Sequence, residues 1–405
     1  MNGRIQLPPT YVVKFYLYRT LVRVSFTAPI WYLYVLENGV TYAGLGTVMA
    51  VWWGGLIAFE IPTGYIGDRI GRRQSLLIAE STATLMYVGM AFASQFFHFV
   101  AIFLVWAAAA TFRSGTASAW LYDTLEERLD EEEYTRIKGR ADAFGLVSSG
   151  ATAVVGGYIA EVSMSLTWLV TGAVVALAIP LVYAFPREEQ FADDDDETFT
   201  VLDAIPVLRE RFSQPPLRAF VVYFGLIGGA YWGVNFFWQP VSTDLGLEVN
   251  RLGWMYAGFT AIGAVATYRS DWFKERISIR SYFTFTPPLL GLAFLVVAVD
   301  PVFAIPVFFL MEAVFRVSGP LGTQFINDQV ETVGRATVLS AAGMVRQLIV
   351  VPFQFGAGVL ADVISPTETI ALFGGLLFAG SVALVLLAAP FDVSAGRETA
   401  ADAGQ

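Results

Sequence analysis

The sequence predicts an all-α polytopic membrane protein built from two successive six-helix bundles, and three observations predict it. Of the 405 residues, 56% are hydrophobic and only 15% are charged, whereas ordinary soluble chains carry about 25% charged residues. Apolar runs recur along the whole chain, each close to the roughly 20 residues that a helix needs to cross a bilayer. Lysine and arginine gather in every second connection between those runs, as the positive-inside rule requires.

Hydropathy places roughly twelve spans. In the first half they are 13–35, 41–65, 74–94, 97–121, 141–161 and 165–185, and in the second half 217–242, 250–268, 281–299, 301–326, 336–361 and 367–390. We therefore expect an N-terminal bundle over 1–185, a cytoplasmic linker over 186–216, a C-terminal bundle over 217–390 and a cytoplasmic tail over 391–405. The acidic run at 193–197 and the two prolines at 215–216 keep the linker out of the membrane.

The connections after the even-numbered spans hold the basic residues, and Arg251 is the visible exception on the other side. An even number of spans with this alternation predicts that both termini are cytoplasmic. We expect a multi-pass protein of the plasma membrane. The basic residues in question are Arg69, Arg72, Arg73, Arg128, Arg136, Lys138, Arg140, Arg187, Arg209, Arg211, Arg269, Lys274, Arg276, Arg280 and Arg335.

Composition excludes several classes of function. The chain has no cysteine and a single histidine, His98, so thiolate chemistry and metal sites made of cysteine or histidine are excluded. We expect no enzyme, no cofactor and no metal. The net charge of −10 with scattered basic residues argues against a nucleic-acid partner. An acidic chain whose only lysines are Lys14, Lys138 and Lys274 is typical of a halophilic prokaryote, and we expect an archaeal source.

A short glycine-rich, basic segment joins the second and third spans and is predicted to be a tight cytoplasmic loop. Its acidic residue, Asp68, stands where the next helix presents its electropositive amino end. The segment resembles the signature loop of the major facilitator superfamily, Gly-x-Leu-Ala-Asp-Arg-x-Gly-Arg-Lys, with three mild departures. It reads Gly64-Tyr65-Ile66-Gly67-Asp68-Arg69-Ile70-Gly71-Arg72-Arg73.

That resemblance implies two pseudo-symmetric bundles that rock about a central substrate site. The halves do repeat, because Arg113 and Arg316 lie in similar motifs and are separated by 203 residues, as are Asp68 and Asp271. The resemblance implies that Asp68, together with neighbouring arginines, holds the halves together when the transporter opens outward. It also implies that Gly64 lies at a helix contact. The expected gating residues are Gly64, Gly67, Asp68, Arg69, Gly71, Arg72, Arg73, Asp271, and Asp123 paired with Arg140 or a loop arginine.

Ionisable residues within the spans are the candidates for substrate and coupling chemistry. Each costs about 2.5–3.5 kcal/mol on insertion scales and therefore usually faces a cavity. By the resemblance, spans one, four, seven and ten line the cavity, where a stripe of span seven adds aromatic and amide groups. The candidate cavity residues are Arg19, Arg23, Glu60, Glu80, Arg113, Tyr231, Asn235, Gln239, Glu312, Arg316 and Arg346.

Three interpretations of these charges stay open. Arg113 and Arg316 could face each other and clamp a carboxylate or phosphate. Alternatively, each arginine pairs with an acid of its own half, Arg113 with Glu60 or Glu80 and Arg316 with Glu312 four residues away. Third, protonation of Glu60, Glu80 or Glu312 could couple transport to a proton gradient.

We therefore predict a secondary active transporter of a small organic solute, driven by a proton or sodium ion. The arginines favour an organic anion, whereas the aromatic stripe favours export of amphipathic compounds. No phosphate-binding loop for ATP is present. A non-transporting sensor on the same fold is the alternative of another class. We expect a monomer whose partners are its substrate, the coupling ion and membrane lipid.

Overall fold

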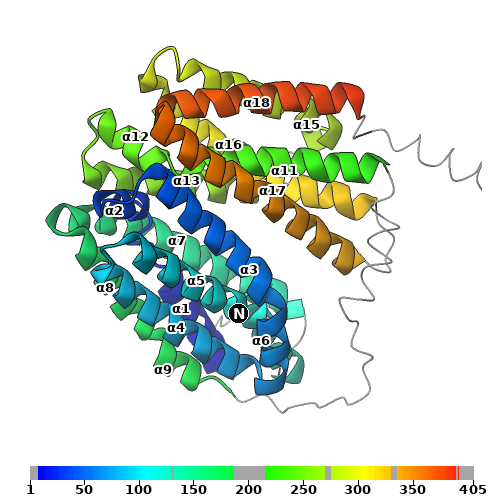
Figure 1. Cartoon of the computed structure of the whole chain (residues 1–405). Coiled ribbons are helices and arrows are strands. Elements are labelled where there is room, and N and C mark those ends of the chain that lie inside the picture. The colour runs from blue at the N-terminus through cyan, green and yellow to red at the C-terminus, as the bar shows by residue number, and fades with distance from the viewer. Residues whose placement is uncertain are drawn as a thin grey trace, which may run out of the picture. The chain divides into compact units, whose positions relative to one another are not determined.

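The computed structural model describes residues 8–128, 132–186, 215–269, 275–329, 335–388 and 391. Within these ranges every regular element is a helix (Figure 1). Each predicted span coincides with one helix or with two successive helices of the described chain. Nine candidate spans among the described residues are long and apolar enough to cross a membrane. The all-helical fold is therefore confirmed, while the full set of crossings and the side of the termini stay predictions.

The chain forms two compact units. The first comprises Met1–Val40, Val51–Ala192 and Leu247–Thr260, and the second comprises Thr41–Ala50, Asp193–Gly246 and Ala261–Gln405. They follow the two predicted bundles except at two helix starts. The start of α3 (Tyr42–Ile70) belongs to the second unit, and the start of α13 (Val249–Tyr268) belongs to the first.

In the first unit, α4 packs against both α5 and α8, and α1 packs against α7. An aromatic cluster fills part of the core, where the Trp120 ring stacks on Phe185 at a centroid distance of 4.0 Å and on Phe15 at 5.9 Å. Each such ring buries a large apolar area, about 150–250 Å², and so contributes strongly to the core. The helices are α1 (Thr10–Val22), α2 (Trp31–Glu37), α4 (Arg72–Phe92), α5 (Phe96–Arg113), α6 (Thr116–Arg128), α7 (Glu132–Val162), α8 (Met164–Ala176) and α9 (Ala178–Tyr183).

In the second unit, α11 lies along α17 and α15 lies along α18 (Figure 1). Small residues bring α15 and α18 close, because a Cβ at Gly291 would lie 2.7 Å from the carbonyl oxygen of Gly374. The helices are α11 (Pro215–Asn235), α12 (Trp238–Asp244), α15 (Ile279–Val296), the 3-10 turn η1 (Pro301–Phe303), α16 (Ala304–Asp328), α17 (Arg335–Val363) and α18 (Pro366–Leu387).

The segment 64–73 is not the loop that the sequence predicted. Helix α3 runs on to Ile70 and α4 begins at Arg72, so a single residue, Gly71, separates them. Its φ of 87° lies in the left-handed region that glycine adopts without steric cost. The other glycines stay helical, and a Cβ at Gly67 would lie 3.2 Å from the Ser75 hydroxyl. The glycine-rich sequence therefore marks a close approach of two helices joined by one turn residue.

Some predicted spans are interrupted. The first breaks between Val22 and Trp31, and the fourth breaks at Ser114 and Gly115. Gly115 has a φ of 73°, which ends α5 and allows α6 to start in a new direction. Backbone groups exposed by such a break at membrane depth must be satisfied by protein or by a cavity. The break in the fourth span lies next to the candidate site.

Candidate functional site

A buried ion pair with a tyrosine lies inside the first unit. Glu80 of α4 has no solvent exposure, and its carboxylate accepts hydrogen bonds from Arg113 Nε at 2.9 Å and Arg113 Nη2 at 2.5 Å. The Tyr18 hydroxyl donates to the same carboxylate at 2.8 Å. Bidentate pairing of this kind is strong and fixes the geometry of both side chains. Of the two partners that the sequence left open for Arg113, the structure selects Glu80.

The second unit contains a cluster of the same three residue types. Glu312 of α16, 3% exposed, accepts from Arg316 Nε at 2.6 Å and from the Tyr231 hydroxyl at 2.6 Å. The Tyr231 ring stacks on Phe315 at 3.6 Å. Asn235 donates to the Tyr231 oxygen at 3.4 Å. Each unit thus holds a tyrosine–glutamate–arginine cluster in which the tyrosine and the glutamate are buried and the arginine is partly exposed.

The polar stripe of span seven is packed inside the second unit. Tyr231 is 5% exposed and Gln239 is fully buried. Because the Tyr231 hydroxyl and ring are both engaged, this face of α11 contributes to packing around Glu312. The stripe therefore offers little aromatic surface to an amphipathic compound.

The remaining intramembrane arginines differ in their partners. Arg19 forms a salt bridge with Asp142 of α7. Arg23 is exposed, and it makes no salt bridge among the described residues. Arg346 of α17 lies over the Phe224 ring at 5.2 Å. No carboxylate pairs with Arg346 in the described part of the chain, so this cation is held by an aromatic face.

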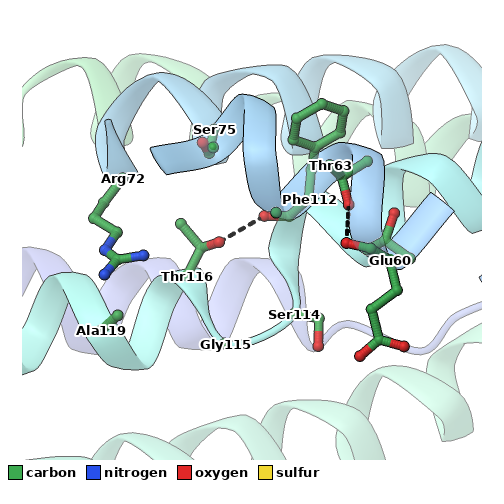
Figure 2. Close-up of a pocket in the computed structure, with 12 residues that line it drawn as sticks. Glu60, Thr63, Arg72, Ser75, Phe112, Ser114, Gly115, Thr116 and Ala119 are labelled. Atoms are coloured by element: carbon green, nitrogen blue, oxygen red, sulfur yellow. Dashed lines mark hydrogen bonds between the residues drawn. The ribbon is translucent and has the colours of Figure 1, made fainter. Parts of the chain in front are cut away.

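A pocket of about 310 Å³ opens in the first unit, beside the break between α5 and α6 (Figure 2). Five hydroxyl side chains and two opposite charges contribute to its lining, with Glu60 and Arg72 at opposite ends. Discontinuous membrane helices commonly mark binding sites, because the break frees backbone groups for a ligand or ion. The pocket is lined by Glu60, Thr63, Gly64, Gly67, Arg72, Ser75, Thr111, Phe112, Ser114, Gly115, Thr116 and Ala119.

Glu60 differs from the other two candidate acids. Glu80 and Glu312 each accept hydrogen bonds from an arginine and a tyrosine. The Glu60 side chain is exposed and lines the pocket. Within the described ranges its carboxylate has neither an ion pair nor a hydrogen bond. Its side chain is thus accessible, in a segment where an ionisable group is costly.

The structure describes only part of the expected gate. Asp123 lies 3.5 Å from Arg72, an arginine of the signature segment, and the gating role of this pair stays a prediction. Arg140 is exposed. Arg69 lies over the Tyr65 ring at 4.3 Å, and Arg73 lies over the Tyr183 ring at 4.8 Å. A Cβ added at Gly64 would have no neighbouring atom within 4 Å, and the side chain of Asp68 and all of Asp271 lie outside the described residues.

Two members of these clusters were absent from the sequence prediction. Tyr18 donates to Glu80, and Asp142 pairs with Arg19. Asp142 could have been predicted, because it is an acid at the start of the fifth predicted span and so resembles the other intramembrane charges. Tyr18 could not have been predicted, since tyrosine is common in apolar helices and its partner lies 62 residues away in the sequence.

Comparison with known proteins places the chain in a family. The sequence profile of the Major Facilitator Superfamily matches residues 20–351. The chain belongs to the Major Facilitator Superfamily. The resemblance of its signature segment is thereby confirmed. The chain is 22% identical over 266 residues to the uncharacterized MFS-type transporter YxaM of Bacillus subtilis (strain 168). This match covers 64% of this chain and 65% of YxaM.

Solved structures of this superfamily share the fold. A structure of the nucleoside transporter NupG has a TM-score of 0.79 at 14% identity and covers 94% of this chain and 98% of its own. A bacterial homologue of the lysosomal transporter Spinster gives 0.71 at 14% identity, with 96% of both chains covered. The D-xylose–proton symporter gives 0.65 at 13% identity, covering 93% of this chain and 95% of its own. At these identities the likeness concerns the fold alone.

Proposed function

We propose that this superfamily member is a secondary active transporter that moves a small organic anion across the plasma membrane by alternating access, coupled to a proton. One observation carries the choice of substrate. Arg346 is a cation within a membrane-spanning helix, and its described contact is an aromatic ring rather than a carboxylate. Charged groups at such depth usually serve a transported substrate or ion.

Three of the other arginines support this choice by elimination, while Arg23, which also makes no salt bridge among the described residues, is exposed and lies just beyond the end of α1. Glu80 offsets the charge of Arg113, and Glu312 offsets that of Arg316. Arg19 is offset by Asp142. An anion that bound to one of these arginines would compete with a carboxylate already in place. Arg346 meets no such competition among the described residues, and a planar guanidinium suits a carboxylate or phosphate bidentately.

Glu60 supports coupling to a proton. A carboxylate takes up a proton more readily when no fixed cation stabilises its charged form. Glu60 is exposed, lines the pocket and has no cation partner among the described residues. The D-xylose–proton symporter, whose name records proton coupling, has the same fold.

A thermal-shift screen of the purified protein tests the substrate class. Organic mono- and dicarboxylates, organic phosphates and lipophilic cations are compared in parallel. A bound ligand raises the transition temperature by mass action, by an amount equivalent to about 2.7 kcal/mol at a hundredfold excess over its Kd. The expected result is a shift with an anion that is lost in Arg346→Gln and partly kept in Arg346→Lys.

Arg218→Gln is the matched control, because Arg218 is an exposed arginine of α11 in the same unit. It should leave the shift intact. A shift produced only by lipophilic cations and unchanged by Arg346→Gln would contradict the proposal and favour export of amphipathic compounds. Flux of the identified ligand into liposomes then separates a transporter from a non-transporting sensor, which would bind the ligand without moving it.

A further inference from the structure

Arg346 is held in place by packing and not by hydrogen bonds. Its side chain leaves α17 beside Gly228 of α11, where an added Cβ would lie 3.5 Å from the arginine Cγ and 3.6 Å from its Cδ. The guanidinium carbon lies over the Phe224 ring, one helical turn before Gly228, at 5.2 Å from the ring centroid. Among the described residues this guanidinium makes no ion pair and donates no hydrogen bond. Its five N–H donors therefore have no protein acceptor there.

The Phe224 ring is itself enclosed by three helices of the second unit. It is 7% exposed, it stacks on Phe220 of α11 at a centroid distance of 6.0 Å, and it meets Phe283 of α15 edge-on at 6.1 Å. A Cβ at Gly322 of α16 would lie 2.7 Å from the Phe224 Cζ and 2.9 Å from each Cε. Because interiors packed this closely resist displacement, the ring is a fixed support for Arg346.

This support makes one side of the Arg346 cation apolar. The face of an aromatic ring carries partial negative charge, which attracts a guanidinium and repels an anion. Every atom of the Phe224 ring is a carbon, so the ring offers no hydrogen-bond donor to a ligand. An anion must therefore bind Arg346 on a side that the ring leaves open, and it must be satisfied there by the arginine.

Anionic groups differ in how well one such cation satisfies them. A carboxylate has two oxygens, and both can accept from the two parallel N–H groups at one edge of a guanidinium. A sulfonate, phosphonate or phosphate monoester has three terminal oxygens, so at least one needs a further donor. The described contacts of Arg346 are a phenyl ring and a glycine, which supply none, and an oxygen left without a partner is costly.

We propose that the anion bound by Arg346 is a carboxylate rather than a sulfonate or a phosphate, and that Phe224 sets this preference by holding the cation in place. The inference rests on the proposed transport of an organic anion and names its chemical class. Phe224 is a positioning residue, since it acts through the arginine. Gly322 acts one step further away, because it makes room for the ring.

Three anionic groups carried on the same carbon skeleton test the preference. A carboxylate, a sulfonate and a phosphonate are compared on propyl, hexyl and phenyl skeletons, and each Kd is taken from a thermal-shift titration. The carboxylate and the sulfonate both carry one negative charge, so this pair separates shape from charge. In at least one set the carboxylate should bind about tenfold more tightly, the ratio that about 1.4 kcal/mol produces. Arg346→Gln should abolish the binding of both.

Two variants test the role of the ring. Phe224→Leu keeps an apolar side chain but removes the aromatic face, so it should weaken carboxylate binding about tenfold and bring the two affinities close together. Gly322→Ala should also reduce the preference for the carboxylate although it does not contact Arg346, because the added carbon would displace the ring. The ratio of the two affinities is the readout, since a general loss of stability would not change it.

Each variant has a matched control in the second unit. Phe308→Leu removes another fully buried phenylalanine, in α16. Gly233→Ala presses an added carbon against a different ring, that of Phe373, at 2.5 Å. Both controls can lower the transition temperature of the free protein, but they should leave the ratio of carboxylate to sulfonate affinity unchanged.

The possible failures are distinguishable. If sulfonate or phosphonate binds as tightly as carboxylate and Arg346→Gln abolishes the binding, the preference is overturned while the proposed organic anion stands. If the ratio is the same in wild-type protein, Phe224→Leu and Gly322→Ala, the positioning role of Phe224 is overturned. If no anion of any set shifts the transition temperature, the proposed function fails and the carboxylate preference fails with it.

Discussion

Arg113 holds the carboxylate of Glu80 with two guanidinium nitrogens, at 2.9 and 2.5 Å, across two helices of the first unit. The matching pair in the second unit, Glu312 and Arg316, lies on one helix and is joined through the Arg316 Nε at 2.6 Å. The two arginines occupy related places in the repeat, but the two pairs differ in exposure. The arginine side chain is 27% exposed in the first pair and 50% in the second. They should therefore differ in how much stability they contribute.

Removing the acid of the buried pair should destabilise the protein strongly. In Glu80→Gln the Arg113 charge stays in place without its carboxylate, which typically costs about 3–5 kcal/mol for a buried pair. Glu312→Gln should cost less, because half of the Arg316 side chain is exposed. Thermal unfolding of the detergent-solubilised variants measures both. Equal losses in the two variants would contradict the difference in burial.

Two glycines of the signature segment should respond to alanine in opposite directions. Gly71→Ala forces a side chain onto a backbone with a φ of 87° and a ψ of 162°, a region used almost only by glycine, which costs about 1–3 kcal/mol. Gly64→Ala introduces a better helix former, favoured by about 0.5–1 kcal/mol, at a helical position with no atom within 4 Å of the added carbon. Thermal unfolding measures whether each variant is more or less stable than the wild-type protein. A loss of stability in Gly64→Ala would show that this residue needs a close helix contact.

The sequence could predict the spans, the family and the pair Glu312–Arg316, because hydropathy, a signature segment and an i,i+4 spacing are local patterns. It could not choose between Glu60 and Glu80 for Arg113, since that depends on how α4 and α5 pack. Nor could it distinguish the glycines that turn the chain from those that stay helical. Gly64 and Gly67 remain in α3, whereas Gly71 and Gly115 take positive φ.

The sequence also could not predict that the starts of α3 and α13 belong to a different unit from the rest of each helix. A linear division into 1–185 and 217–390 cannot place Thr41–Ala50 in the second unit. The acids at these helix starts could be noticed in the sequence: Asp362 accepts hydrogen bonds from the backbone N–H groups of Tyr42 and Ala43, and Glu161 accepts one from the Asn250 side chain. Asp362 and Glu161 each stand one residue before the end of a long apolar helix, a weak signal that only the hydrogen bonds make interpretable.

The pair Arg72–Asp123 should affect transport more than stability. Both side chains are partly exposed, at 38% and 39%, and lie 3.5 Å apart, and exposed pairs contribute at most about 1 kcal/mol. Arg72→Glu should slow flux in liposomes, and the charge reversal Arg72→Glu with Asp123→Arg should restore part of it. Arg136→Glu, which disrupts an exposed pair within α7, is the control. Loss of flux without rescue would assign Arg72 to the pocket rather than to the pair.

Glu60→Gln should uncouple transport from the proton gradient. Glutamine keeps the shape of the side chain but cannot take up a proton, so uptake driven by an inward proton gradient should be lost. Exchange of labelled for unlabelled substrate across the same liposomes needs no net proton movement and should persist. A pH-sensitive dye inside the liposomes measures the proton that accompanies the substrate, and Glu37→Gln, at an exposed acid that ends α2, is the control.

If proton-driven uptake and exchange both fail in Glu60→Gln, Glu60 binds substrate or shapes the pocket instead. If an inward sodium gradient drives uptake of wild-type protein without a proton gradient, the coupling ion is sodium and the proposed role of Glu60 is wrong.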